Sequence, residues 1–386
     1  MFQLAGIMLK ILVFSNYYLP GFKGGGPIKT LKNLFDYTGD KFRFELVTSD
    51  RDLGDQVPYH SVDVGDWNKL GNSWIFYSPS GWKGYKCILH VLFGGDIQIV
   101  YLNSFFSIRY SFFPLLISRL LGKRIVLGPR GEFSEGALKI RTARKRVFIS
   151  VSKLFGLHTG IVFQASSNFE EQDIRRVMGP YVSIKVAENI GSREFAKTIP
   201  ARSERELNAV FVSRISPKKN LLSALGMLSS VSRPVRYDIY GPIEDKEYWG
   251  RCLEVIKALP EHVKVTHKGM LSPDEVVPTL AEYDVFFFPT KGENYGHVIA
   301  EALCAGLPIL IANTTPWRDL DEIGIGWDLP LDNAEAFSAT LDRLAAMSID
   351  EHLQMRKTVL AWAKNKFSQR DAIEANIAMF RYAYEN

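Results

Sequence analysis

Cysteine is scarce in this sequence of 386 residues. The three cysteines, Cys87, Cys252 and Cys304, are odd in number and lie far apart along the chain. A disulfide framework needs cysteines in pairs, and a structural zinc site needs them clustered, so this usage favours neither. The sequence therefore indicates a reducing compartment, and we predict a cytoplasmic protein.

Long apolar runs are also missing. The most apolar region, "YSFFPLLISRLLG", is interrupted by Pro114 and Arg119, whereas a membrane span needs about 18 consecutive apolar residues. The first residues, "MFQLAGIMLKILVFS", lack the charged n-region and the cleavage site of a signal peptide. We therefore expect no membrane span and no signal peptide, and Met8 is a second candidate for the start of translation.

Acidic residues are few in the first half of the chain. Residues 1–200 hold 26 Lys and Arg against 16 Asp and Glu, a net charge of +10, whereas residues 201–386 hold 21 against 26, a net charge of −5. A basic half is typical of proteins that bind phosphate-bearing ligands, nucleic acid or an anionic membrane face. No nucleic-acid motif accompanies the charge, so we do not expect a nucleic-acid partner.

The sequence does contain a regular alternation of short β-branched or aromatic runs with helix-length segments. The expected strands of the first half are "KILVFS", "FRFELVTS", "IQIVYLN", "RIVLGPRG" and "GIVFQAS", and those of the second half are "LNAVFVSRIS", "RYDIYGP", "VKVTHKG", "DVFFFPT" and "LPILIAN". This alternation predicts an α/β chain with two Rossmann-like, doubly wound domains. A ligand site is then expected at the carboxyl ends of the strands.

The domain boundary is predicted near residue 206. The segment "ENIGSREFAKTIPARSERELN" is polar and has little apolar periodicity, which is typical of a linker. The prediction is thus a first domain over 1–206, a second over 207–368 and a closing helix over 369–386. The closing helix is expected from four apolar residues at near-helical spacing: Ile373, Ile377, Met379 and Phe380.

Two glutamates flank a predicted helix start in "PTKGENYGHVIAEALCAGLP". Glu293 precedes the helix, Glu301 lies more than one turn inside it, and Gly306 is its expected C′ residue. The free amides of about Gly296, His297 and Val298 form a natural anion site. The alternative is that Glu293 only complements the helix dipole and that Glu301 is solvated.

Two further loops follow predicted strands. In "VFVSRISPKKNLL", Arg214 and Lys219 stand five residues apart across a strand-to-helix turn, so two cations can converge on a diphosphate. The alternative is a solvated charge pair at Lys218 and Lys219. In "FKGGGPIKTLKNL", three glycines at 24–26 allow a close backbone approach to a ligand or form a flexible turn.

Together these segments resemble the retaining nucleotide-sugar glycosyltransferases of the GT-B fold, family GT4. The resemblance covers nearly the whole chain and is carried by the Gly-Gly loop, by S-R-x-x-x-K-K-N and by E-N-Y-G-H-V-I-x-E-A-L-x-A-G-x-P. "GPRGEFSEGAL" and "TTPWRDL" are similar to a bacterial polysaccharide-assembly branch of that family. The resemblance implies two Rossmann-like domains facing across a cleft, the first binding acceptor and the second binding donor. It also implies that the C-terminal helix closes back toward the N-terminal domain.

The resemblance implies a role for each candidate residue. Arg214 and Lys219 grip the donor diphosphate, Glu301 accepts from the ribose hydroxyls, and Glu293 lies near the sugar hydroxyls and the anomeric carbon. The implied donor-binding set is Gly25, Gly26, Arg214, Lys219, Glu293, Asn294, Gly296, His297, Val298 and Glu301, and the implied catalytic set is Glu293, Arg130, Arg214 and Lys219.

Arg130 marks a departure from the family, because many members have a histidine at about its place. An arginine cannot act as a base, but it can bond a sugar or its phosphate. The alternative is a structural arginine paired with Glu132 or Glu135.

The implied activity is transfer of a hexose from a UDP- or GDP-sugar to a glycan or polyprenyl-linked acceptor, with retention, in bacterial surface polysaccharide biosynthesis. No cofactor and no metal are expected, because cations and amides meet the diphosphate charge. A GT-B nucleotide-sugar epimerase and a catalytically inactive sugar-nucleotide-binding protein are the alternatives.

Two other interpretations of the carboxylates are disfavoured. A glycoside hydrolase also uses two carboxylates, but it has no need of a diphosphate cradle. The D-x-D of "SDRDLGD", Asp50 and Asp52, follows an early strand and is interpreted as a loop rather than a metal site.

The segment "KIRTARKRVFISVSKLFG" is interpreted as a basic amphipathic helix. Its basic residues include Arg141, Arg144, Lys145, Arg146 and Lys153, and its apolar residues include Val147, Phe148, Val151 and Phe155. Two interpretations remain open: the solvated face of an ordinary core helix, and peripheral binding to the anionic inner face of the cell membrane.

Overall fold

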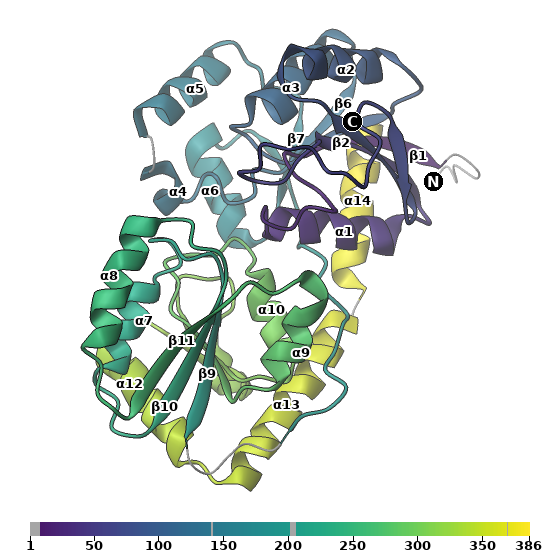
Figure 1. Cartoon of the computed structure of the whole chain (residues 1–386). Helices are drawn as coiled ribbons and strands as arrows, with labels where there is room; N and C mark the ends of the chain where they lie inside the picture. Colours follow the sequence, from purple (N-terminus) through teal and green to yellow (C-terminus); the bar gives the residue numbers. More distant parts are fainter. Residues whose placement is uncertain (1–7, 140–141, 201–205, 369) are drawn as a thin grey trace. The chain divides into compact units, whose positions relative to one another are not determined.

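The computed structural model describes residues 8–139, 142–200, 206–368 and 370–386 (Figure 1). It divides into two compact units, Met1–Ile190 with Arg370–Asn386 and Gly191–Gln369. We refer to them as unit 1 and unit 2. The division lies before the predicted boundary near residue 206, because the start of the polar segment is bound to unit 2. The Ala196 amide donates to the Cys304 carbonyl (3.0 Å), and the Arg193 guanidinium donates to the Phe367 carbonyl (2.9 Å).

Unit 1 contains an eight-stranded sheet in the order β3-β4-β2-β1-β5-β6-β7-β8. All neighbouring strands are parallel except β3 and β4, which are antiparallel. The strands are β1 Leu9–Phe14, β2 Phe42–Ser49, β3 Trp67–Leu70, β4 Ser73–Ser78, β5 Ile99–Leu102, β6 Arg124–Leu127, β7 Val162–Ala165 and β8 Ser183–Val186. The five strands expected from the sequence are present. The sequence prediction missed the edge strands β3 and β8 and also β4, which lies next to β3.

Helices cover both faces of this sheet because alternate residues of its strands are buried on opposite sides. Ile11 and Val13 pack with α1 and α14, whereas Leu12 and Phe14 pack with α2, α3 and α6. The helices of unit 1 are α1 Gly26–Thr38, α2 Gly81–Phe93, the π-helix η1 Ile108–Phe112, α3 Phe113–Leu120, α4 Glu135–Lys139, α5 Thr142–Leu154, α6 Asn168–Met178 and α14 Asp371–Glu385. The predicted closing helix is α14. It packs on the sheet of unit 1 through the Phe380 ring, whose centroid lies 5.4 Å from Phe42 and 5.2 Å from Tyr101.

Unit 2 contains a six-stranded, fully parallel sheet in the order β11-β10-β9-β12-β13-β14. The strands are β9 Leu207–Val212, β10 Val235–Tyr240, β11 Val263–Gly269, β12 Val285–Phe288, β13 Ile309–Ala312 and β14 Gly326–Leu329. Only β14, the short edge strand, was not expected. The order reverses between β9 and β12, and such a switch point is where doubly wound sheets bind ligands.

Two layers of helices cover the sheet of unit 2, with α7, α8 and α12 on one side and α9, α10 and α13 on the other (Figure 1). Their bounds are α7 Leu221–Leu228, α8 Lys246–Lys257, the 3₁₀ helix η2 Pro273–Glu275, α9 Val276–Ala281, α10 His297–Cys304, α11 Leu320–Ile323, α12 Ala334–Ala346 and α13 Ile349–Ser368. Across the described ranges, no helix has both the length and the apolarity that a bilayer crossing requires.

Candidate functional site

Two loops of unit 2 meet at the switch point of its sheet. One loop, residues 213–220, follows β9, and the other, residues 289–296, follows β12. Backbone and side-chain hydrogen bonds join them: the Lys291 amide donates to the Lys218 carbonyl (3.0 Å), and the Asn220 side chain donates to the Pro289 carbonyl (2.8 Å). The two loops therefore behave as one body and hold their side chains in a fixed arrangement.

The centre of this arrangement is an ion pair between Lys219 and Glu293. The Lys219 Nζ lies 2.7 Å from Glu293 Oε1 and 2.9 Å from Oε2, and the two side chains are only 13% and 11% exposed. The Thr290 hydroxyl also donates to Glu293 Oε1 (3.0 Å). Charge-assisted hydrogen bonds of this kind are strong and directional. The pair therefore fixes the position of both charged groups before any ligand arrives.

Asn220 turns the chain from the first loop into α7. Its φ is 61°, in the left-handed region that asparagine tolerates better than most residues. The Asn220 side chain also accepts from the Ser223 hydroxyl at 2.8 Å. The turn directly follows Lys219 and fixes the backbone from which that side chain extends.

Arg214, the second predicted cation, forms an ion pair with Glu244. The Arg214 Nη1 lies 2.8 Å from Glu244 Oε1, and both side chains are partly exposed at 39% and 43%. Glu244 belongs to the loop after β10. Exposed pairs contribute little to stability, so this contact leaves the guanidinium available for exchange with a stronger anion.

The helix after the second loop begins as predicted. Gly296, the N-cap of α10, has a φ of 81°, and a Cβ there would lie 2.8 Å from Ile299 Cδ1. Both its conformation and its surroundings therefore require glycine. The Gly296 carbonyl accepts hydrogen bonds from the amides of Ile299 (2.9 Å) and Ala300 (3.2 Å). The amides ahead of Ile299 have no acceptor within the helix, which is the basis of an anion site at a helix N-terminus.

Glu301 is buried, with 6% of its surface exposed. The alternative of a solvated Glu301 is therefore wrong. Burial, with a further contribution from the Glu301 carboxylate, raises the pKa of the nearby Cys304 thiol to about 12. At the other end of α10, Gly306 has a φ of 65°, as expected for the C′ residue.

Aromatic rings hold the second loop against unit 2. The Tyr295 ring lies 4.8 Å from His297 and 5.6 Å from Trp317, and the Trp317 indole donates to the Tyr295 carbonyl. His297, Asn294 and Val298 are each half-buried. The loop is therefore packed rather than free in solvent.

In unit 1, the glycine loop precedes α1. Gly25 is its N-cap, with a φ of 69°, and a Cβ at that position would meet nothing within 4 Å. Gly26 is the first residue of α1. The backbone is therefore open to a ligand at Gly25, as the sequence prediction requires.

The D-x-D segment, Asp50 and Asp52, stabilises loops of unit 1. The buried Asp52 carboxylate accepts the amides of Phe22 (2.8 Å), Lys23 (3.0 Å) and Leu53 (2.8 Å). It thereby ties the start of the glycine loop to the loop after β2. Asp50 pairs with the Arg51 guanidinium (2.8 Å). In the part of the chain that the structure describes, no group of three or more His, Cys, Asp or Glu is placed to hold a metal ion.

Arg130 lies in unit 1, in the loop after β6, and its φ of 57° is left-handed. Its guanidinium donates to the side chains of Asn103 (2.7 Å) and Asn189 (2.8 Å) and to the Tyr101 hydroxyl. The alternative that Arg130 pairs with Glu132 is wrong. Glu132 instead accepts from the Ser104 hydroxyl (2.7 Å) and from backbone amides, and burial raises its pKa. The Glu135 side chain lies outside the described residues.

A buried network continues from Arg130 into the closing helix. The Tyr101 hydroxyl donates to Gln164, whose amide group donates to Asn376 (3.2 Å) on α14. Asn376 in turn donates to the Glu188 carbonyl (2.9 Å). The last helix of the chain thus helps to fix the surroundings of Arg130.

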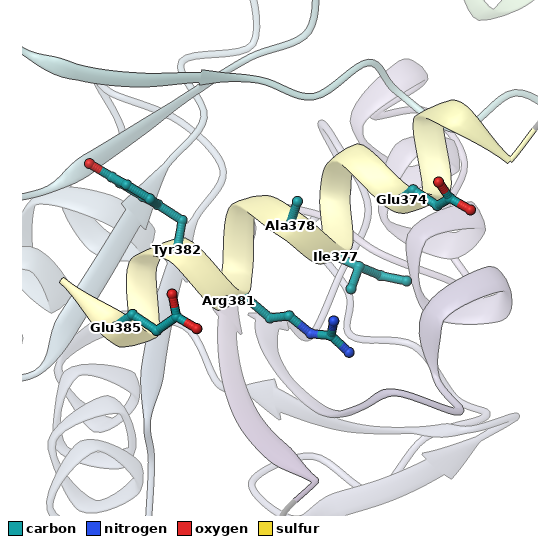
Figure 2. Close-up of a pocket in the computed structure, with 6 residues that line it drawn as sticks. All are labelled: Glu374, Ile377, Ala378, Arg381, Tyr382 and Glu385. Atoms are coloured by element: carbon teal, nitrogen blue, oxygen red, sulfur yellow. The ribbon is translucent and has the colours of Figure 1, made fainter. Parts of the chain in front are cut away.

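Figure 2 shows a pocket in unit 1 that is lined by residues of α14 alone. These residues are Glu374, Ile377, Ala378, Arg381, Tyr382 and Glu385. They lie on the helix face opposite the buried Met379 and Phe380. The pocket contains none of the predicted site residues.

Sequence reasoning found some members of the site and missed others. The structure brings Lys219 and Glu293 together, while Arg214 pairs with Glu244. Gly25, Gly26 and Arg130 belong to the other unit. The sequence prediction missed Thr290, although it stands three residues before Glu293 in the same segment. It also missed Glu244, for which no local pattern exists, because it lies 30 residues from Arg214.

Comparison with known proteins gives a family match and a set of related folds. Residues 192–360, most of unit 2, match the model of the family described as Glycosyl transferases group 1. No curated protein sequence matches the chain.

The solved structures that resemble the chain include HepE of Anabaena, described in complex with UDP and glucose. HepE is 16% identical, has a TM-score of 0.70, and the match covers 98% of this chain and 100% of HepE. Sucrose-phosphate synthase of Thermosynechococcus elongatus is 13% identical, with a TM-score of 0.73 and coverage of 97% and 98%. WaaG, a glycosyltransferase involved in lipopolysaccharide biosynthesis, is 11% identical, with a TM-score of 0.66 and coverage of 96% and 99%. At these identities the likeness shows the fold, two Rossmann-like domains of the GT-B type.

Proposed function

We propose that this chain is a retaining glycosyltransferase that moves a hexose from a UDP- or GDP-sugar to a glycan or polyprenyl-linked acceptor in bacterial surface polysaccharide biosynthesis. The observation that carries the proposal is the Lys219–Glu293 pair at the switch point of the sheet in unit 2. The match of residues 192–360 to a glycosyltransferase family supports the reaction class. The UDP and UDP-glucose complexes of HepE support a nucleotide-sugar donor.

In this proposal unit 2 stabilises the departing nucleoside diphosphate. Breaking the bond between the sugar and the phosphate builds negative charge on the leaving group and positive charge on the sugar ring. Lys219, Arg214 and the first amides of α10 meet the negative charge. Since these charges are larger in the transition state than in the ground state, the contacts accelerate the reaction.

The two glutamates have different partners in the proposed reaction. Glu301 accepts from the ribose hydroxyls, and Glu293 bonds the sugar hydroxyls and stabilises the ring as it gains positive charge. Because Glu293 and Lys219 already hold each other, the donor enters a site whose cation and carboxylate are in place. No protein nucleophile takes part. The acceptor attacks from the face of the leaving group, and the donor phosphate takes its proton.

The chain would act in the cytoplasm without a metal or other cofactor, at the inner face of the cell membrane where a polyprenyl-linked acceptor is available. Arg130 would bond the sugar or its phosphate. Since Arg130 already donates to Asn103, Asn189 and Tyr101, it would offer the ligand only its remaining donor positions.

A donor screen tests the proposed function. Purified protein is incubated with UDP-, GDP- and ADP-sugars, and release of the nucleoside diphosphate is followed with and without glycan acceptors. We expect slow donor hydrolysis with one nucleotide class and its loss in Lys219→Ala, whereas the exposed Lys257→Ala serves as a matched control that retains activity. Isomerisation of the sugar without release of diphosphate would favour the epimerase. Nucleotide binding without turnover on any donor would favour the inactive binder.

A further inference from the structure

The positive charge of the first half of the chain is concentrated in one segment. Residues 81–169 contain thirteen Lys and Arg against three Asp and Glu, and the remainder of residues 1–200 contains thirteen of each. The whole excess of +10 therefore comes from 89 consecutive positions. These positions include α2, α3 and α5, and each of these helices contributes side chains to the same hydrophobic layer on one face of the sheet of unit 1.

The helix α5 has apolar side chains on two sides. On its inner side, the Phe148 ring packs against the rings of Phe105 (5.6 Å), Phe106 (5.8 Å) and Phe112 (5.1 Å). Lys145 also turns inward, where its Nζ donates to the Ala137 carbonyl (2.6 Å) and lies 5.0 Å from the centre of the Phe106 ring. Packing against the core therefore explains the side chains on the inner side of α5 but not the apolar side chains on its outer side.

On the outer side, α5 and the residue that follows it expose an apolar ridge. The exposed fractions are 62% for Val147, 42% for Val151, 81% for Leu154 and 70% for Phe155. The spacing of four, seven and eight residues from Val147 places all four on one face of a helix. An ordinary core helix would have polar residues on its outer face, so the ridge needs another explanation.

Cations flank this ridge. Arg144, Arg146 and Lys153 are exposed on α5, and the helix contains no acidic residue. The end of α3 lies beside the segment that follows α5, because Arg119 donates to the carbonyls of Leu157 (3.2 Å) and Thr159 (2.6 Å). Leu120, the next residue, is 83% exposed. Arg141 of the predicted basic helix lies outside the described residues.

We propose that this surface, the ridge of Val147, Val151, Leu154 and Phe155 with Arg144, Arg146 and Lys153, docks on an anionic lipid bilayer. An interfacial helix buries apolar side chains among the acyl chains while neighbouring cations bind the headgroup phosphates. Charge complementarity favours the anionic bilayer as the binding partner of this surface. A second copy of the chain would bring two basic surfaces together, and nucleic acid would leave the ridge exposed to water.

Binding to vesicles tests the docking surface and requires no enzymatic activity. The full chain is floated with vesicles of phosphatidylcholine alone and of phosphatidylcholine mixed with phosphatidylglycerol, at low and high salt. We expect binding to the anionic vesicles that weakens with salt. Each cation near an anionic surface strengthens binding about fivefold, so the variant R144Q/R146Q/K153Q should bind about 100-fold more weakly.

Two further variants separate the contributions. The variant V147S/V151S/L154S keeps the charge and removes the ridge, and it should also lose binding to anionic vesicles. The matched control K41Q/R43Q/K69Q removes the same charge from exposed positions outside residues 81–169, and it should bind as the parent chain does. Thermal melting of each variant confirms that it is folded.

Three results would overturn the proposal: equal binding to neutral vesicles, an equal loss in the control variant, or a change from dimer to monomer in the ridge variant without vesicle binding by the parent chain. Because the assay does not use a donor, docking and the proposed transferase activity succeed or fail separately.

Discussion

Replacing Glu293 by glutamine should separate nucleotide binding from turnover. Both oxygens of the Glu293 carboxylate accept hydrogen bonds from the Lys219 ammonium. A donor diphosphate must therefore either displace Glu293 from the Lys219 ammonium or bind the ammonium beside Glu293. Glutamine has nearly the same shape but no charge, so the variant weakens the bond to the Lys219 cation and removes the anion near the sugar.

The expected magnitudes follow from these contacts. A hydrogen bond to a charged group contributes about 1.5–3 kcal/mol, so Lys219→Ala should weaken binding of the nucleoside diphosphate by about 10- to 150-fold. Glu293→Gln should leave that affinity unchanged or raise it by up to about tenfold, because the neutral amide oxygen of glutamine holds the Lys219 ammonium less tightly than a carboxylate does. Its turnover should fall by about 100- to 1,000-fold, the usual effect of removing one group that stabilises transition-state charge.

Calorimetry with UDP and GDP, together with turnover on the same protein samples, measures both quantities. Glu301→Ala provides the contrast, since loss of a ribose contact should weaken both the free nucleotide and the intact donor. Thr290→Val is a milder change at the same site, because it removes one hydrogen bond to Glu293 and leaves the charges of Glu293 and Lys219 in place. The interpretation is refuted if Glu293→Gln loses nucleotide affinity as Lys219→Ala does, or if it turns over at the parent rate.

Three further predictions concern stability, each measured by denaturant unfolding. Gly296→Ala should cost about 1–3 kcal/mol, because alanine is strained at a φ of 81° and its Cβ would lie 2.8 Å from Ile299 Cδ1; Gly250→Ala, on the helix α8 with nothing within 4 Å of the added Cβ, is the control and should be neutral or stabilising. Asp52→Ala should cost about 2–4 kcal/mol, because three backbone amides lose their acceptor; an unchanged unfolding midpoint would contradict the role given to this carboxylate. Burial lowers the pKa of His158 from 6.5 to about 4, so the unfolded chain takes up the proton first and stability should fall as the pH drops from 6.5 to 4, by about 2 kcal/mol at pH 5. His158→Phe should remove that part of the acid sensitivity, and the same pH dependence in both proteins would argue against this assignment.

Features encoded by neighbouring residues were predictable from the sequence. The helix 297–304 and Gly306 after its end both follow from patterns within about ten residues, and the structure confirms them. The ten predicted strands were likewise visible as short apolar runs between turn residues. The missed strands β3, β8 and β14 lie at sheet edges, which need few apolar side chains, and the missed strand β4 lies beside β3.

Features that depend on distant residues were not predictable. The partner of Arg214 is supplied by the loop after another strand, and the partners of Asp52 are amides about 30 residues away. The polar segment after Ile190 has the composition of a linker, but its backbone and side chains bond to unit 2. Composition predicts solvent exposure on average and does not show which hydrogen bonds a particular segment will form.

The return of the chain to unit 1 has a consequence for its synthesis. The core of unit 1 needs Phe380, and the network around Arg130 needs Asn376, yet both residues are made after the whole of unit 2. During translation the first 190 residues therefore leave the ribosome with one face of their sheet covered only in part, by α1, and this unit completes its fold last although it is made first. A nonsense mutation or a frameshift in codons 371–376 would remove Asn376 and Phe380 and would consequently damage unit 1.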